Sequence, residues 1–290
     1  MAQQKIQLRK IRDFGENFSD TFQFIKQEFK PLLISFTLVC GIFILANAIL
    51  TGLFQKETLS ILDDMVKGVL YERTVTFTPT YFILIGVSVM SLAAMRTVVS
   101  VYMKYYDENG ASPTVQEVWR SFTKYFLRIF LFGIPRYVLI AVGFVFCIAP
   151  GVYLLVVLMP YSFIIVNENE SFGESFGRCF DIIKDNFWIS LAIYLIAFLI
   201  FSISSSLIGF TVSAIAGAAS YFTTKEISST LAIVTSILSI VQYFFYIIFF
   251  VSAGLHYYNL VEARDGIGLT RRLDNLGSNI NPHASTEEQY

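Results

Sequence analysis

Long stretches of the chain carry no charged side chain, and the charges gather between them. The uncharged runs cover 31–55, 74–95, 137–167, 186–224 and 227–261. An α-helix needs about 20 mostly apolar residues to cross a bilayer core of about 30 Å. The pattern therefore predicts an all-α membrane protein with six spans, at 31–54, 80–103, 129–148, 151–166, 187–212 and 231–257. The third run, with the apolar residues before it, holds two spans because Pro150-Gly151 is a strong turn signal.

Composition supports a membrane protein. Of the 290 residues, 55% are hydrophobic and 15% charged, where a soluble domain carries about 25% charged residues. All 22 acidic residues lie outside the predicted spans, which argues against a proton or cation site inside the bilayer. A net charge of -1 gives no reason to expect a nucleic-acid partner. Cys40, Cys147 and Cys179 are far apart, so we expect no metal site and no cofactor.

The basic residues predict an orientation for the spans. An even number of spans puts both termini on one side, and most Lys and Arg residues then share that side. The positive-inside rule makes it the cytoplasm. We expect one membrane domain over 1–278 and a polar C-terminal tail over 279–290.

Three segments ahead of the predicted hairpins have apolar residues at helical spacing, which predicts amphipathic helices on the cytoplasmic membrane surface. Their apolar faces begin at Phe18, Val115 and Phe172. Each opens with a cap-like pair: Asn17 with Asp20, Thr114 with Glu117, and Ser171 with Glu174. These features favour three parallel repeats of a surface helix plus a hairpin, over 14–104, 115–166 and 171–258. Alternatively, any helix that re-enters a membrane needs aromatic anchors and caps.

Four polar side chains are candidates for lipid or ligand contact. Arg96 lies inside a predicted span, where a charge is costly and often functional; alternatively, it extends toward the headgroups near Lys104, about 12 Å along the helix. Arg136, beside Pro135, has lipid phosphate as its expected partner. The side chains of Asn47 and Gln242 either form hydrogen bonds between helices or contact a substrate.

Two further patterns have a simple structural interpretation beside a functional one. Small residues recur every four positions and predict a close helix contact, within the chain or with another chain: Ser205, Gly209, Ser213 and Gly217. His256 stands without a second ligand nearby, so an interfacial role is favoured over a metal ligand or a base. The sequence contains none of the common catalytic motifs.

The passage Pro160 to Glu168, followed by 171–188, and the closing stretch His256 to Leu260 and Asp265 to Leu269 carry a family resemblance. They resemble the membrane domain fused to some glycerophosphodiester phosphodiesterases, and related six-span proteins of Bacteroidota. This resemblance implies a bacterial inner-membrane protein. It implies no activity, because the fused enzymes use a separate barrel of about 250 residues.

The sequence thus favours a non-catalytic inner-membrane protein, a scaffold or accessory subunit. Its expected partners are membrane lipids and either other membrane subunits or further copies of the chain. The alternative is a transporter or flippase-like protein for a lipidic or amphiphilic solute. In that alternative Arg96, Asn47 and Gln242 would meet at one cavity.

Overall fold

The computed structural model describes residues 5–66, 78–223, 227–268 and 270, without the side chains of 61–66, 220–223 and 227–229. The tail predicted at 279–290 lies outside these residues. The described part is almost entirely helical and contains no strand. Its elements are α1 (Phe14–Val66), α2 (Pro79–Asn109), α3 (Val115–Phe146), α4 (Ile148–Val157), α5 (Tyr161–Asn167), α6 (Phe172–Ile183), the 3-10 turn η1 (Lys184–Asn186), α7 (Phe187–Thr223) and α8 (Ile227–Asp265).

Six segments of the described chain are long and apolar enough to cross a membrane. They are Phe14–Ser60, Pro79–Asn109, Val115–Phe146, Ile148–Asn167, Phe172–Ala219 and Thr230–Asp265. This confirms the predicted fold class, a helical multi-pass membrane protein. In α1, one face is buried through Leu32, Phe36 and Cys40, while Leu38 and Ile42 are exposed on another. An exposed aliphatic stripe on so long a helix is suited to lipid rather than to water.

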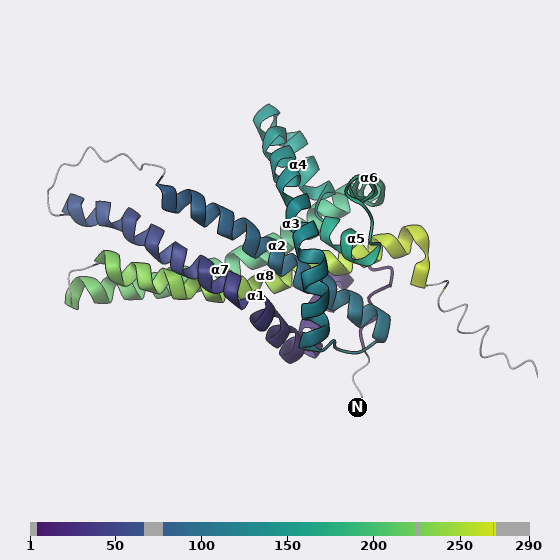
Figure 1. The fold of residues 1–290 in the computed structure, drawn as a ribbon, viewed down its shortest axis with the longest axis horizontal. Coiled ribbons are helices and arrows are strands. Elements are labelled where there is room, and N and C mark those ends of the chain that lie inside the picture. The colour runs from purple at the N-terminus through teal and green to yellow at the C-terminus, as the bar shows by residue number, and fades with distance from the viewer. Residues whose placement is uncertain (1–4, 67–77, 224–226, 269, 271–290) are drawn as a thin grey trace, which may run out of the picture.

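Four long helices lie side by side in the order α2, α1, α8 and α7 (Figure 1). The hairpin of α3 and α4 packs on α2 near its base, and its tip projects away from this row (Figure 1). The N-terminal segment packs on α8, where the side chain of Asn259 bonds both the N–H and the C=O of Arg12, each at 3.0 Å. We call the end of the bundle where the N-terminal segment meets Asn259 of α8 the terminal end.

The predicted surface helices are not all separate elements. The first and second are continuous with the spans that follow, in α1 and α3, and these helices contain Pro31 and Pro135. Only the third stands alone, as α6, with η1 between it and α7. The three repeats therefore remain a prediction.

Two of the three predicted helix starts are confirmed. Thr114 with Glu117 and Ser171 with Glu174 form capping boxes. The start at Asn17 is wrong. There α1 begins at Phe14, and the pair that shields its first amides is Asp13 with Glu16, whose carboxylates accept each other's backbone N–H. Asn17 lies one turn inside the helix and donates to Ser252 Oγ at 3.1 Å, so it joins α1 to α8.

The turn predicted at Pro150-Gly151 is also misplaced. The chain breaks at Cys147, whose backbone is extended, and Pro150 stands in the first turn of α4. Proline is tolerated there because the first amides of a helix have no intrahelical acceptor. The second arm of the hairpin breaks again between α4 and α5, just before Tyr161.

Gly143 and Gly151 set the close approach of α3 and α4. A Cβ added at Gly143 would lie 3.0 Å from the Gly151 Cα atom. We expect Gly143→Leu to separate the two helices and lower the free energy of unfolding by about 2 kcal/mol or more, measured by thermal unfolding in detergent. Gly86→Leu is the control, since nothing lies within 4 Å of a Cβ there. Equal effects of the two changes would contradict the close approach.

Candidate anion site

A polar stripe on α2 faces the short helix α5. From the terminal end inward, Lys104 Nζ donates to the Val166 carbonyl at 2.8 Å, and Ser100 Oγ donates to Ser162 Oγ at 3.2 Å. Arg96 comes next at the same four-residue spacing, which keeps the three side chains near one face of the helix. Its guanidinium stands over the ring of Tyr161 at 5.4 Å.

Arg136 reaches the same tyrosine from α3. Its guanidinium lies 5.2 Å from the Tyr161 ring centroid and 5.1 Å from that of Tyr137. Its Nε donates to the Leu158 carbonyl at 3.0 Å. Leu158 belongs to the break between α4 and α5, where the helical hydrogen-bond ladder is interrupted. The break thus supplies Arg136 with an acceptor.

The two guanidinium groups therefore share one aromatic ring, and both are buried. Arg96 is 8% exposed and Arg136 is 3% exposed. Arg96 is near enough to act electrostatically on Arg136. The remaining neighbours of Arg96 are aromatic: the ring of Phe250 lies 5.2 Å away, and the phenol of Tyr246 is close.

No carboxylate balances this pair among the described residues. None of the ion pairs found there includes Arg96 or Arg136. Two of their nitrogen atoms, Arg96 Nε and Arg136 Nη1, are buried without a hydrogen-bond partner. Paired like charges with free donors, surrounded by phenol rings, are suited to an anion that accepts hydrogen bonds from both.

Both arginines are more enclosed by the chain than the sequence suggested. Each stands eight residues, or about 12 Å, from a basic residue at the terminal end: Lys104 for Arg96, and Arg128, which bonds Asn169, for Arg136. The Arg96 side chain is buried within the chain, whereas contact with the headgroups would need an exposed guanidinium. Arg136 is likewise enclosed rather than placed at the surface. The sequence offered no sign that the two would meet.

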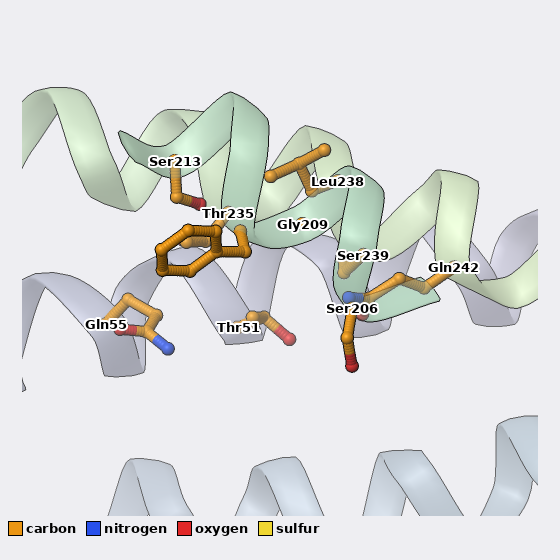
Figure 2. Close-up of a pocket in the computed structure, with 10 residues that line it drawn as sticks. Thr51, Gln55, Ser206, Gly209, Ser213, Thr235, Leu238, Ser239 and Gln242 are labelled. Carbon is orange, nitrogen blue, oxygen red and sulfur yellow. The ribbon is translucent and has the colours of Figure 1, made fainter. Parts of the chain in front are cut away.

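The other candidates lie elsewhere. Asn47 donates to Ser88 Oγ at 2.8 Å and so joins α1 to α2. Gln242 lines a polar groove between α1, α7 and α8 (Figure 2). Asn47 approaches this groove only through Thr51, whose hydroxyl donates to its amide oxygen at 3.3 Å. Arg96, Asn47 and Gln242 therefore do not share one cavity.

The small-residue stripe on α7 packs within the chain. A Cβ at Gly209 would lie 3.3 Å from Gln242 Nε2, and one at Gly217 would lie 3.7 Å from the Leu231 side chain. Ser213 lines the same groove as Gly209, and Ser205 is buried. At these contacts the stripe faces α8, so the close helix contact lies within the chain rather than with another chain.

His256 is buried between α8 and α7. Its Nε2 lies 2.8 Å from Ser190 Oγ, and its ring meets Tyr194 edge-on at 5.4 Å. Both members of the histidine–serine pair are fully buried, and the hydrogen-bond partners found for His256 in the described part include no carboxylate. Nor do those residues contain a group of three or more His, Cys, Asp or Glu that could hold a metal ion. The geometry is that of a packing contact.

Comparisons with protein-family models, with curated proteins and with solved structures found no match to this chain. The site is therefore interpreted from its own geometry.

Proposed function

We propose that this protein binds the anionic headgroup of an amphiphile between Arg96 and Arg136, as a transporter or flippase-like protein would. The observation that carries the proposal is the pair of buried guanidinium groups on one tyrosine ring without a carboxylate partner in the described chain. A charge within a membrane span is costly and is characteristic of substrate pathways. A scaffold that only packs against its neighbours has no need for such a pair.

The chemistry of the pair favours a phosphate or carboxylate group. A guanidinium presents its donors in a planar fork that matches both groups, and one anion can bridge two such forks. Bridging would also offset the repulsion between Arg96 and Arg136. The bound headgroup would lie about 12 Å inside the terminal end, with its acyl chains along the exposed apolar helix faces. A headgroup held so deep suits movement through the membrane better than attachment at its surface.

Orientation and location are part of the same proposal. The excess of basic residues on the terminal side supports cytoplasmic termini. The resemblance to the membrane domain of glycerophosphodiester phosphodiesterases supports the bacterial inner membrane and a chain without catalytic activity. Anionic lipids are abundant in that leaflet and are attracted by Lys and Arg near the surface. We propose membrane lipids as the main partners.

The binding proposal is tested with defined ligands added to purified protein in a neutral detergent. We expect phosphatidylglycerol to bind, by native mass spectrometry and by a thermal shift, and zwitterionic phosphatidylcholine to bind more weakly. Oleate tests a carboxylate amphiphile, and inorganic phosphate tests the free anion. Arg96→Gln should lower the affinity for the preferred ligand about ten- to hundredfold, because hydrogen bonds between the guanidinium and the anion are lost.

The control is Arg120→Gln, which removes one positive charge from the exposed part of α3. It should leave lipid binding within about twofold of the wild type, as expected for a solvent-exposed charge. If Arg96→Gln and Arg120→Gln weaken binding equally, a diffuse basic surface binds the lipid and the proposed site is wrong.

A further inference from the structure

A polar groove lies in the half of the bundle away from the arginine pair. It has a volume of about 390 Å³ and is formed by α1, α7 and α8 (Figure 2). Its polar lining includes Thr51 and Gln55 from α1, Ser206 and Ser213 from α7, and Thr235 and Gln242 from α8. None of the described lining residues is charged. Seven of the ten lining residues carry a hydroxyl or an amide group, an unusual share on helices that must face hydrocarbon.

The hydrogen bonds of the groove are incomplete. The hydroxyl groups of Thr51 and Thr235 donate within their own helices, to Asn47 Oδ1 and to the Leu231 carbonyl. The side chains of Gln55, Gln242, Ser206 and Ser213, in contrast, make no hydrogen bond with another described residue. An amide left unpaired in an apolar medium costs several kcal/mol. The groove therefore needs an occupant that can donate and accept hydrogen bonds.

The groove runs inward from the end of the bundle opposite the terminal end. Gln55 directly precedes the charged residues Lys56 and Glu57, and the Glu57 carboxylate accepts hydrogen bonds from the hydroxyls of Thr78 and Thr80 at 3.1 and 2.9 Å. A polar cluster of this kind is expected at the membrane surface on that side. From Ser213 to Ser206 the groove descends about 10 Å along α7.

An aromatic layer lies beyond the inner end of the groove. One turn below Gln242 on α8, the ring of Tyr246 lies 4.2 Å from that of Phe201 and stacks on Phe250 at 5.7 Å. Arg96 stands over the far side of this layer, against Phe250. The polar groove and the arginine pair are thus separated by aromatic rings.

From this geometry we propose that the groove is a water-filled vestibule that enters the membrane from the end opposite the termini. Its unpaired amides and hydroxyls hold water and the uncharged hydrogen-bonding groups of a solute, such as hydroxyls. Because its lining has no charge, it does not select anions. The vestibule does not depend on anion binding at Arg96 and Arg136.

Cysteine accessibility tests the vestibule in the full-length protein reconstituted in vesicles. Cys147 is exposed and is replaced by alanine, whereas Cys40 and Cys179 are buried and can remain. Ser206→Cys and Gln242→Cys are then treated with a charged, membrane-impermeant methanethiosulfonate. We expect labelling at least about ten times faster than at a lipid-facing site, because the reactive thiolate forms only where water reaches the thiol.

The controls are the adjacent positions, Leu207→Cys and Val241→Cys, which lie at the same depth and are exposed on the apolar helix surface. Reagent confined to the side opposite the termini should label Ser206→Cys faster than the control Leu207→Cys. Labelling of Ser206→Cys and Gln242→Cys no faster than their neighbours, or only from the terminal side, would overturn the proposal. The effect of Arg96→Gln on lipid binding tests the anion site alone, and cysteine labelling tests the vestibule alone. Either proposal can therefore fail while the other stands.

Discussion

Replacing Arg136 with glutamine is expected to stabilise the ligand-free protein and to abolish its stabilisation by anionic lipid. In the free protein Arg136 is 3% exposed and shares Tyr161 with a second positive charge. Removing one of two uncompensated buried charges relieves both their repulsion and the desolvation of one ion, which costs on the order of several kcal/mol. The glutamine amide can still donate to the Leu158 carbonyl, so that acceptor need not be left unpaired.

The measurement is the midpoint of thermal unfolding in neutral detergent, with and without phosphatidylglycerol. Arg136→Gln should raise the midpoint without lipid and show little further rise when lipid is added. Arg136→Lys is the matched control, because it keeps the charge but loses the planar fork of donors. It should unfold near the wild-type temperature without lipid and respond more weakly to it. A midpoint that falls in Arg136→Gln, with the lipid response intact, would assign Arg136 a purely structural role.

Such opposed effects on stability and binding are common at functional sites. A structural arginine has its donors satisfied by the fold, so its loss leaves acceptors unpaired. Arg12 is of that kind. Arg136 Nη1, in contrast, has no hydrogen-bond partner among the described residues. A further acceptor is needed to satisfy all the donors of this side chain.

The spans could be predicted because the length of an uncharged run is a local property. Arg96 and Arg136, in contrast, lie forty residues apart on different helices, and their meeting depends on how α2 and α3 pack around α5. Nothing in either segment encodes that packing. The groove around Gln242 was missed for the same reason, since its polar side chains come from three helices and each alone is unremarkable in sequence.

The local errors have local causes. Pro150 is compatible with a turn and with the first turn of a helix, and the sequence does not separate the two. Near the start of α1, the pairs Asp13 with Glu16 and Asn17 with Asp20 have the same spacing, so the sequence permits either helix start. Nothing in the sequence distinguishes Arg12 from the other basic residues near the N-terminus, although its buried side chain bonds three carbonyl groups of the N-terminal segment.

Arg12 organises the N-terminal segment from within. Its side chain is fully buried and donates to the carbonyls of Leu8 at 2.7 Å and Lys10 at 3.1 Å, and to that of Gln7. Its Nε donates to Asp20 Oδ2 at 2.7 Å. The segment is thus folded around one guanidinium, and its backbone is held on α8 by Asn259.

We expect Arg12→Ala to lower the free energy of unfolding by about 3 kcal/mol, because it leaves buried carbonyl groups and a carboxylate without their donor. Residues 5–12 should loosen first, because the Arg12 side chain bonds three of their carbonyl groups. Two polar contacts of the segment remain: Arg9 pairs with Asp107 at 2.8 Å, and Lys5 Nζ donates to the Gly110 carbonyl at 2.6 Å. Thermal unfolding measures the overall loss, and hydrogen–deuterium exchange of the N-terminal peptide measures the local one. Exchange in that peptide should become clearly faster than in the wild-type protein.

Lys10→Ala is the matched control, two residues away. Lys10 pairs with Glu16 at 3.1 Å, but both side chains are 44% exposed, and exposed ion pairs contribute about 0–1 kcal/mol. Its loss should leave the unfolding midpoint and the exchange of 5–12 nearly unchanged. If both variants behaved alike, the segment would be held by the apolar contacts of Ile6 and Leu8 and by the ion pair of Arg9 with Asp107. The buried guanidinium of Arg12 would then have no special part in closing the terminal end.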